Sequence, residues 1–276
     1  MKFAWVGIPT YQVTKLSFKG VYSMSDPKIF ALIIGTEILN RRRVDRHFDF
    51  MTKIINEYGL KLSGSLTIED DPALIVQTLK FLASQPNALI FSFGGIGSTP
   101  DDYTRKCAAI ALRDGTLYTH PEAKAIIEER LGDNAYPHPI HMADLPKGAA
   151  LLKNPINKMP AFSLDERYFF MPGFPEMSHP MVESILKKLF PRKHSWYRYT
   201  LTALCKENEL IDIMKQMPED VEFSSLPKLY SDGWRVSISV ASHDNDLARR
   251  AIQMYIDELE RKKIPYSMTD ESNGFA

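Results

Sequence analysis

The residues best suited to ligand chemistry lie between Phe91 and Asp102, in the run Phe-Ser-Phe-Gly-Gly-Ile-Gly-Ser-Thr-Pro-Asp-Asp. Its glycines allow the backbone to turn sharply and to pass close to a ligand. Free backbone N–H groups ahead of a helix attract phosphate, whereas the adjacent carboxylates of Asp101 and Asp102 repel it. A divalent cation would allow the carboxylates and a phosphate to lie close together, because Mg²⁺ is commonly held by both kinds of group. The run therefore predicts a phosphorylated ligand bound with a Mg²⁺-type cation.

A purely structural interpretation of the same run stays open. In it, Thr99 caps a helix, Pro100 takes the first helical position, and the two aspartates stabilise the first turn through the helix dipole. The known phosphate signatures do not separate the two interpretations. The sequence has no G-x-x-x-x-G-K-[ST], and Gly95-Ile96-Gly97 lacks the third glycine of G-x-G-x-x-G. Both interpretations predict a strand, a glycine loop and a helix that begins at Thr99.

The elements that position this run form a repeating pattern. Buried strands are predicted at Ile29–Ile34, Leu60–Ile68 and Ala88–Phe91, and amphipathic helices at 48–58 and 72–82. Strands that alternate with helices at this rhythm indicate right-handed βαβ units, a parallel sheet and helices on both of its faces. A further strand is predicted at 168–171 and a closing helix at 177–190.

The carboxyl ends of parallel strands share one edge of a sheet, so polar turns that are distant in the sequence should meet there. Four such turns are predicted: Thr36-Glu37, Glu69-Asp70-Asp71, Gly94 to Asp102, and Met171 to Glu176. Four together favour a ligand site over a set of unrelated helix caps. The alternative that Asp70 or Asp71 is only a helix cap stays open.

Another helix is predicted at 121–131, followed by a proline-rich segment with His138 and His141, to which we assign no role because no third ligand accompanies them. After a predicted linker at 191–196 the pattern restarts. Strands are expected at 197–204, 221–226 and 234–240, and helices at 207–217 and 247–259. This β-α-β-β-α order predicts a small ferredoxin-like α+β domain over 197–276, with a loose tail from Met268.

Composition sets limits on the class of protein. The chain has 276 residues, 44% hydrophobic and 25% charged, with a formal net charge of zero. Such a chain suits one large or two modest domains, and its balanced charge gives no electrostatic case for nucleic acid. No apolar run reaches the roughly 18 residues of a membrane span, so we expect no membrane contact. The two cysteines, Cys107 and Cys205, lack metal-ligand spacing and indicate reduced thiols in a cytoplasmic protein.

Residues 1–23 carry aromatic residues and lysines without clear periodicity, and Met24 directly precedes a typical domain start. We expect this segment to be an N-terminal extension, with Met24 as a candidate initiator. It is not expected to be a secretory signal, because it has no continuous apolar region.

With its motifs placed, the chain resembles the MoaB/Mog molybdopterin-binding domain superfamily, most closely the N-terminal domain of the competence/damage-inducible CinA family. It is also similar to the domain fused to eukaryotic FAD synthases. Four ordered motifs carry the resemblance. The family's G-D/T-E-L-L, V-G-D-D, G-G-L-G-P-T-P-D-D-x-T and L-P-G-V-P-x-E-M are matched by Gly35 to Leu39, Ile68 to Asp71, Gly94 to Thr104 and, one residue shorter, Met171 to Met177.

The resemblance implies an α/β fold, a three-layer sandwich around a mostly parallel sheet, over residues 24–190. The small α+β domain over 197–276 also looks like the one that follows in CinA proteins. A homo-oligomer is implied as well.

The activity that the resemblance implies is a metal-dependent pyrophosphatase that cleaves the P–O–P bond of ADP-ribose or FAD. Its cofactor would be a divalent cation such as Mg²⁺ or Co²⁺, with no haem, flavin prosthetic group or zinc site. A second hypothesis is molybdopterin binding or adenylylation in cofactor synthesis. A third is a binding module whose activity has decayed. The partner is therefore expected to be a small phosphorylated nucleotide or a pterin.

The resemblance also implies roles for residues at the four turns. Asp70 and Asp102 would be catalytic, and they align with the two functional aspartates of Mog-type proteins. The implied metal ligands are Glu37, Asp101 and Asp102. The implied phosphate and substrate contacts are Gly35, Thr36, Gly94, Gly95, Gly97, Ser98, Thr99, Pro172, Gly173 and Glu176.

Two departures from the family pattern bear on activity. Where the family has N-P-x-G-T-A-P-G, this chain has Asn154 to Ala161 with Asn157-Lys158-Met159 in place of Gly-Thr-Ala. The turn after the first strand reads Asn40-Arg41-Arg42-Arg43, where the family tends to have a glycine. The C-terminal amidase domain of full CinA proteins is not in this sequence, so deamidation is not carried over.

Overall fold

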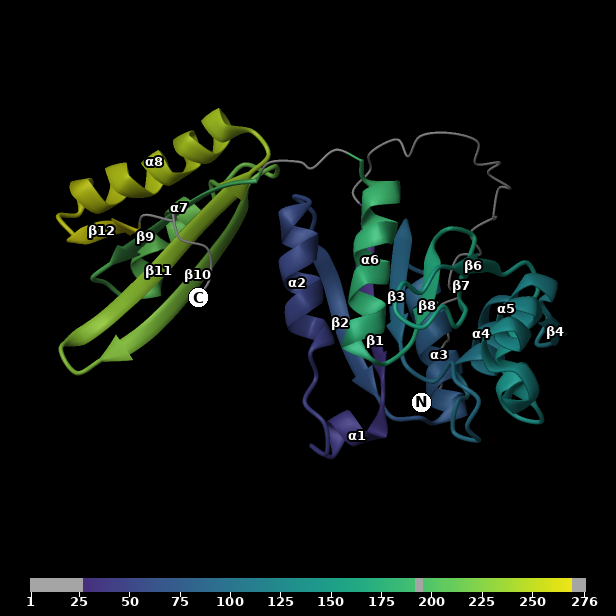
Figure 1. The fold of residues 1–276 in the computed structure, drawn as a ribbon. Helices are drawn as coiled ribbons and strands as arrows, with labels where there is room; N and C mark the ends of the chain where they lie inside the picture. Colours follow the sequence, from purple (N-terminus) through teal and green to yellow (C-terminus); the bar gives the residue numbers. More distant parts are fainter. Residues whose placement is uncertain (1–26, 192–195, 270–276) are drawn as a thin grey trace, which may run out of the picture.

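The computed structural model of the protein describes residues 27–191 and 196–269 (Figure 1). The predicted N-terminal extension and the candidate start at Met24 lie outside these residues, as do residues 192–195 of the predicted linker.

The first sheet is built around four parallel strands. In spatial order these are β2 (Leu62–Ile68), β1 (Lys28–Ile34), β3 (Ala88–Phe93) and β8 (Tyr168–Met171). Strands β3 and β8 are buried along their whole length, and β1 at every residue after the first. Side chains alternate between the two faces of a strand, so both faces of the sheet are covered. The predicted parallel sheet is confirmed.

Two antiparallel strands that the sequence pattern did not indicate extend this sheet. β7 (Ala161–Leu164) pairs with β8, and β6 (Ala150–Leu152) pairs with β7 at the edge. A separate two-stranded sheet joins β4 (Leu117–Thr119) to β5 (Asp144–Pro146). These four strands have only three or four residues each, too few for a period of two to stand out.

Six helices accompany the first sheet. α2 (His47–Glu57) contacts α6 (Pro175–Leu189), and Figure 1 shows both in front of the strands. α3 (Pro72–Ala83) packs on α4 (Thr104–Leu112), and α5 (Pro121–Leu131) has the predicted bounds. The short α1 (Thr36–Leu39) directly follows β1. The 3₁₀ turn η1 (Gly132–Ala135) directly follows α5, and η2 (Pro139–Ala143) covers the end of the Pro/His segment.

The second sheet is antiparallel, in the order β10-β11-β9-β12. Its strands are β9 (Tyr197–Ala203), β10 (Glu222–Tyr230), β11 (Gly233–Ser242) and β12 (Tyr266–Thr269), and α8 (Asn245–Arg261) lies between the last two. The expected helix at 207–217 is wrong in extent, since the segment forms η3 (Glu207–Leu210) and the single turn α7 (Ile211–Met214). The prediction of a loose tail from Met268 is wrong for its first two residues, because Met268 and Thr269 pair with β9.

Each sheet has its own hydrophobic core. One cluster of buried residues belongs to the first sheet and its helices, and a separate cluster, with Val236, Ile238 and Tyr255 among its members, lies between the second sheet and α8. An ion pair joins the two parts, with 2.9 Å between Lys61 Nζ and Glu222 Oε2. Both cysteines are free and buried, as expected. In the described ranges no helix is long and apolar enough to cross a membrane.

Candidate functional site

The four polar turns lie at the carboxyl ends of neighbouring parallel strands, and backbone contacts join them. The Gly35 amide donates to the Ile68 carbonyl at 3.0 Å, which ties the turn after β1 to the turn after β2. The Gly94 amide donates to the Met171 carbonyl at 3.0 Å, which ties β3 to β8. Gly173 lies against Gly94, since a Cβ on Gly173 would be 3.3 Å from the Gly94 Cα. The predicted gathering of the turns at one edge is confirmed.

Asp70 is fixed by Thr36. Its Oδ2 accepts hydrogen bonds from the Thr36 amide at 2.8 Å and the Thr36 hydroxyl at 2.9 Å, while the Asp70 amide donates to the Thr36 hydroxyl at 3.1 Å. The helix cap is the neighbouring Asp71, whose Oδ1 accepts from the Leu74 amide at 2.7 Å at the start of α3. The two aspartates therefore differ in role, and Asp70 is not the cap.

The first two glycines of the loop have backbones that favour glycine. Gly94 has φ 103° and Gly95 has φ 67°. A Cβ would lie 2.3 Å from the Ile34 carbonyl oxygen at Gly94 and 2.3 Å from Thr104 Oγ1 at Gly95. The Thr104 hydroxyl donates to the Gly94 carbonyl at 3.0 Å, and its amide donates to the Gly95 carbonyl at 2.9 Å. The loop is thus held against both the end of β1 and the start of α4.

The predicted helix start at Thr99 is wrong, because α4 begins at Thr104. The Asp102 carboxylate bends back instead, and its Oδ2 accepts from the Thr99 amide at 2.8 Å and the Thr99 hydroxyl at 2.5 Å. These bonds close a turn before the helix can begin, and Asp101 lies exposed within it. At Gly97 a Cβ would lie 2.6 Å from Asp102 Oδ2, so glycine is needed there for the carboxylate to approach.

The remaining predicted contacts lie beside these residues. Ser98 is half-buried in the glycine loop, and Pro172 is half-buried directly after β8.

Arg105 in α4 holds the loop from the inside. It is 8% exposed, and its guanidinium donates to the carbonyls of Gly97 (2.7 Å), Asp144 (3.2 Å) and His141. Burial lowers the pKa of Arg105, while the carboxylates of Asp102 and Asp144 oppose that shift. One buried cation therefore connects the glycine loop to the Pro/His segment.

The two glutamates of the predicted site are both paired with arginines. Glu37 Oε1 lies 4.0 Å from Arg43 Nη1, and Glu176 Oε1 lies 3.0 Å from Arg46 Nη1. The Arg43 guanidinium lies over the Phe174 ring, 5.0 Å from its centroid. The glutamates thus sit on an arginine-rich rim of the site.

Two histidines pack behind the loop that follows β8. His47 stacks on Phe93 with 4.3 Å between ring centroids, and its Nε2 lies 3.3 Å from the Gly173 carbonyl oxygen. His179 stacks on Phe50 at 3.7 Å. Burial lowers the pKa of His47. Burial is also the largest cause that lowers the pKa of His179, to about 4. Both rings are neutral packing groups at pH 7.

The loop that departs from the family pattern is closed by its own amides. Asn157 Oδ1 accepts from Asn154 Nδ2 at 2.7 Å and from the Met159 amide at 3.0 Å. Asn157 Nδ2 lies 3.6 Å from Met177 Sδ in the first turns of α6. Lys158 has a left-handed backbone, with φ 61°. The Asn157 side chain therefore fills space that a glycine would leave open.

The predicted metal ligands do not form a preformed cage. Within the described residues, no three acidic, histidine or cysteine side chains gather as metal ligands. Glu37 is paired with Arg43, and Asp101 is exposed. Asp70 and Asp102 each have one oxygen fixed by a threonine, and the other makes no hydrogen bond within the described ranges. This donor set fits a cation shared between one or two carboxylates and a ligand's phosphates, which is common for Mg²⁺.

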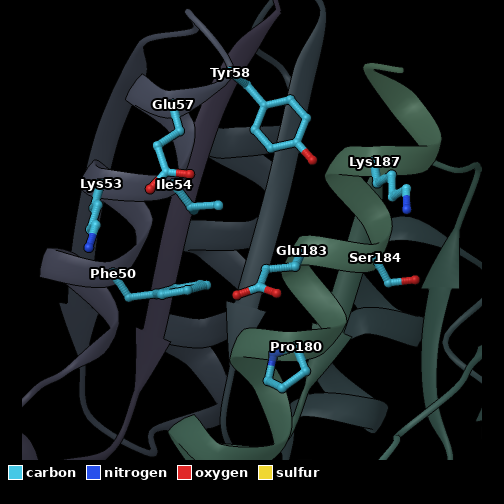
Figure 2. A pocket seen from close by; sticks show the side chains of 9 residues that line it. All are labelled: Phe50, Lys53, Ile54, Glu57, Tyr58, Pro180, Glu183, Ser184 and Lys187. Carbon is cyan, nitrogen blue, oxygen red and sulfur yellow. The ribbon is translucent and has the colours of Figure 1, made fainter. Parts of the chain in front are cut away.

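A cavity of about 640 Å³ lies elsewhere, between α2 and α6 (Figure 2). Aromatic rings and charges of both signs line it, and Figure 2 shows Phe50 and Glu183 pointing toward one another across it. Its lining residues are Phe50, Lys53, Ile54, Glu57, Tyr58, Pro180, Glu183, Ser184 and Lys187. It contains none of the predicted site residues.

Sequence reasoning missed Arg105, Arg46 and His47. A signal existed for His47, which stands four and eight residues before Met51 and Ile55 on the buried face of α2. Arg105 directly follows the last threonine of the glycine motif, but no pattern in the sequence indicates that it is buried.

The comparisons with known proteins agree with this geometry. Residues 30–192 match the family model described as a probable molybdopterin binding domain. A CinA-like protein of Citrifermentans bemidjiense is 33% identical over 183 residues, which cover 63% of this chain and 44% of the relative. Protein PF0476 of Pyrococcus furiosus is 28% identical over 238 residues, which cover 80% of this chain and 93% of that protein.

A solved structure supports the fold. The protein CinA with unknown function from Thermoplasma acidophilum superposes with a TM-score of 0.53 at 23% identity, covering 59% of this chain and 99% of that chain. The first CinA-like relatives are more than twice as long as the matched region, since this chain spans 39–44% of their length. Through residues 30–192, which include the glycine loop, the chain belongs to the MoaB/Mog molybdopterin-binding domain family, with CinA-like proteins among its relatives.

Proposed function

We propose that this chain is a pyrophosphatase that hydrolyses the P–O–P bond of a nucleotide diphosphate such as ADP-ribose or FAD, at the carboxyl edge of the first sheet. One observation carries the proposal. Asp70, in the turn after β2, and Asp102, at the end of the glycine loop, are each fixed through one carboxylate oxygen by a threonine, at 2.9 and 2.5 Å from the hydroxyls. Carboxylates held in this way are preorganised to act on a ligand between them.

The glycine loop supplies the phosphate contacts. Gly94 and Gly95 allow the tight turn of the loop, because a Cβ on them would meet the Ile34 carbonyl oxygen and Thr104 Oγ1, and Arg105 holds the loop from the buried side. Backbone N–H groups of such a loop can bind phosphate oxygens directly. Because the loop is fixed before the ligand arrives, little reorganisation is needed during the reaction.

Asp70 and Asp102 would orient the reacting groups through their second oxygens. A bound divalent cation would neutralise the diphosphate and lower the pKa of its water. The water oxygen forms a bond to one phosphorus while the bridging oxygen leaves with the other phosphate, and the water's proton passes to a carboxylate or to solvent. The products are two monophosphates.

Turnover is the decisive test. The purified chain is incubated with ADP-ribose and, separately, FAD, with Mg²⁺ or Co²⁺, and release of the monophosphates is measured. Metal-dependent release that is lost in Asp102→Asn supports the proposal. No release from either compound with either metal contradicts it.

A second candidate is molybdopterin binding or adenylylation. The observation that favours it is the aspartate pair, because Asp70 and Asp102 occupy the positions that the family resemblance assigns to Mog-type function. Binding of molybdopterin without release of monophosphates from ADP-ribose would favour this candidate. A decayed binding module is favoured by the filled loop at Asn157, and binding without any turnover would support it.

We also infer the finer architecture and assembly. The sheet with helices on both faces suits a three-layer sandwich, and the β-α-β-β-α-β order of the second part suits a ferredoxin-like domain. We propose that the chain forms a homo-oligomer, as the resemblance implies. Light scattering at micromolar concentration tests this, and a monomer would contradict it.

A further inference from the structure

The segment between α1 and α2 reaches across the sheet edge to the loop after β8. β3 lies between β1 and β8 in the sheet, yet Arg46 Nη1 lies 3.0 Å from Glu176 Oε1, and His47 Nε2 lies 3.3 Å from the Gly173 carbonyl oxygen. Arg41 has a left-handed backbone, with φ 60°, in the turn where the family tends to have a glycine. The segment therefore crosses near the end of β3, where the glycine loop begins, and it carries arginine side chains there.

Arg43 lies over an aromatic ring and remains accessible. Its guanidinium lies 5.0 Å from the centroid of the Phe174 ring, which is 53% exposed. Its ion pair with Glu37 is long, at 4.0 Å, and both side chains are about 40% exposed. Exposed pairs of this kind contribute little stability, so a better anion can replace the glutamate.

The Glu176 carboxylate does not depend on Arg46 alone. Glu176 is in the first turn of α6. Its own backbone amide is the first cause that lowers the pKa of the carboxyl, ahead of the Arg46 charge. The carboxylate therefore remains stabilised when Arg46 turns to another partner.

We propose that Arg43 and Arg46, with Phe174 as the support for Arg43, form a metal-independent binding site for the phosphate groups of the ligand. This inference rests on the proposed function, because it concerns the recognition of the same diphosphate. An arginine fork donates two parallel hydrogen bonds to phosphate, and stacking on an aromatic ring orients the fork before binding. The exposed carboxylates of Glu37 and Glu176 occupy the arginines until the ligand arrives.

The test measures binding rather than turnover. Inorganic pyrophosphate is titrated into the full chain by calorimetry, with EDTA present to remove divalent cations. Arg43→Ala and Arg46→Ala should each raise the Kd about tenfold or more, because each removes charge-assisted hydrogen bonds. Arg43→Lys should give an intermediate Kd, since it keeps the charge and loses the fork.

Arg42→Ala is the matched control. It removes the same charge one residue away, and the Arg42 amide and Nε bind Asn40 Oδ1 at 3.2 and 3.1 Å instead of a residue of the site. Its Kd should change by less than about twofold, because distant exposed charges are screened by salt. Thermal unfolding tests whether each variant is folded. If Arg43→Ala is not folded, the Kd of Arg43→Lys is compared with that of Arg42→Ala instead.

Equal Kd values for the Arg43 and Arg42 variants would overturn the inference, as would no binding of pyrophosphate by the wild-type chain. The outcomes also separate the two proposals. If pyrophosphate binding depends on Arg43 but ADP-ribose is not hydrolysed, this binding site is supported and the pyrophosphatase is contradicted. If ADP-ribose is hydrolysed but the Kd of pyrophosphate is unchanged in Arg43→Ala, the pyrophosphatase is supported and this binding site is overturned.

Discussion

Neighbouring aspartates in this chain have different partners, and the partners indicate different tasks. Asp71 binds the Leu74 amide of its own helix, whereas Asp70 binds Thr36, 34 residues earlier in the chain. A local cap stabilises one helix, while a long-range pair fixes a carboxylate at the point where two strands end. The partner of Asp102 is local, since Thr99 lies three residues earlier. Like Asp70, however, Asp102 has one oxygen held by a threonine and the other without a hydrogen bond in the part of the chain that the structure describes.

Asp102→Asn should reduce turnover far more than stability. The asparagine Oδ1 can still accept from the Thr99 amide and hydroxyl, so the free energy of unfolding should fall by about 1 kcal/mol or less. Loss of one preorganised charge at a reacting diphosphate typically costs about 10²-fold or more in rate. Urea unfolding and kcat for ADP-ribose measure the two effects on the same preparation.

Asp71→Asn serves as the matched control, because it removes the same charge from a residue beside Asp70 and can still cap α3. Turnover should stay close to wild type. Equal loss of turnover in both variants would mean that the site responds to overall charge rather than to the Asp102 carboxylate.

The buried histidines predict a pH-dependent stability. Burial lowers the pKa of His179 from 6.5 to about 4, and the pKa of His47 is lowered too. The unfolded chain therefore binds more protons between these pH values. The stability that the neutral rings provide is complete above pH 6.5 and is lost as the pH falls toward about 4.

Urea unfolding at about pH 7 and about pH 5 measures this effect. His179→Gln should reduce the difference between the two pH values, because one titrating group is removed. His138→Gln, at an exposed position, should leave the difference unchanged. A pH dependence that is the same in both variants would show that other groups cause it.

At the scale of elements, the long elements were predictable and the short ones were not. Continuous apolar runs identified β1, β3 and β8, and helical spacing identified α2, α3 and α5. β12 was missed because Tyr266–Thr269 is mostly exposed and is fixed only by pairing with β9. β6 was missed because a short edge strand depends on partners that are distant in the sequence. β7 lies between β8 and β6 and was missed because its four residues are all buried and show no alternation.

The start of α4 shows how side chains override local signals. Thr99 and Pro100 are typical of a helix start, yet the Asp102 carboxylate returns to Thr99 and closes a separate turn. Thr104 then ties the true start of α4 to Gly94 and Gly95. The site residues could be predicted from the family motifs, but the bonds that hold them could not.

Arg105 connects α4 to the glycine loop and to the Pro/His segment, so its replacement should destabilise the chain strongly. Arg105→Met would leave the carbonyls of Gly97, His141 and Asp144 without their donor. Unsatisfied buried groups cost about 1–3 kcal/mol each, so the free energy of unfolding should fall by at least about 2 kcal/mol. Denaturant unfolding measures the loss.

Lys106→Met is the control on the same helix. Lys106 is exposed and donates only to the Gly115 carbonyl, at 2.7 Å. Its unfolding free energy should change by less than about 0.5 kcal/mol. If the two variants lost the same stability, the buried guanidinium would not be what holds the loop.

At the scale of the whole molecule, two separate cores are joined by a weak contact. The Lys61–Glu222 ion pair involves a lysine side chain that is 71% exposed, so it should couple the two parts by about 1 kcal/mol or less. We therefore expect two unfolding transitions in calorimetry rather than one. Trp234 lies in β11, so tryptophan fluorescence can report on the second part in a variant that carries phenylalanine in place of Trp5 and Trp196.

A ligand of the strand-end site should then stabilise only the first core. With ADP-ribose and Mg²⁺ at about 100 times the Kd, the transition of that core should gain about 2.7 kcal/mol, while the transition reported by tryptophan should not move. Lys61→Ala should leave this separation unchanged, because the pair that it removes is weak. A single transition that shifts as a whole with ligand would show that the two cores unfold together, and the effect of Lys61→Ala on that shift would then measure how much of the coupling passes through Glu222.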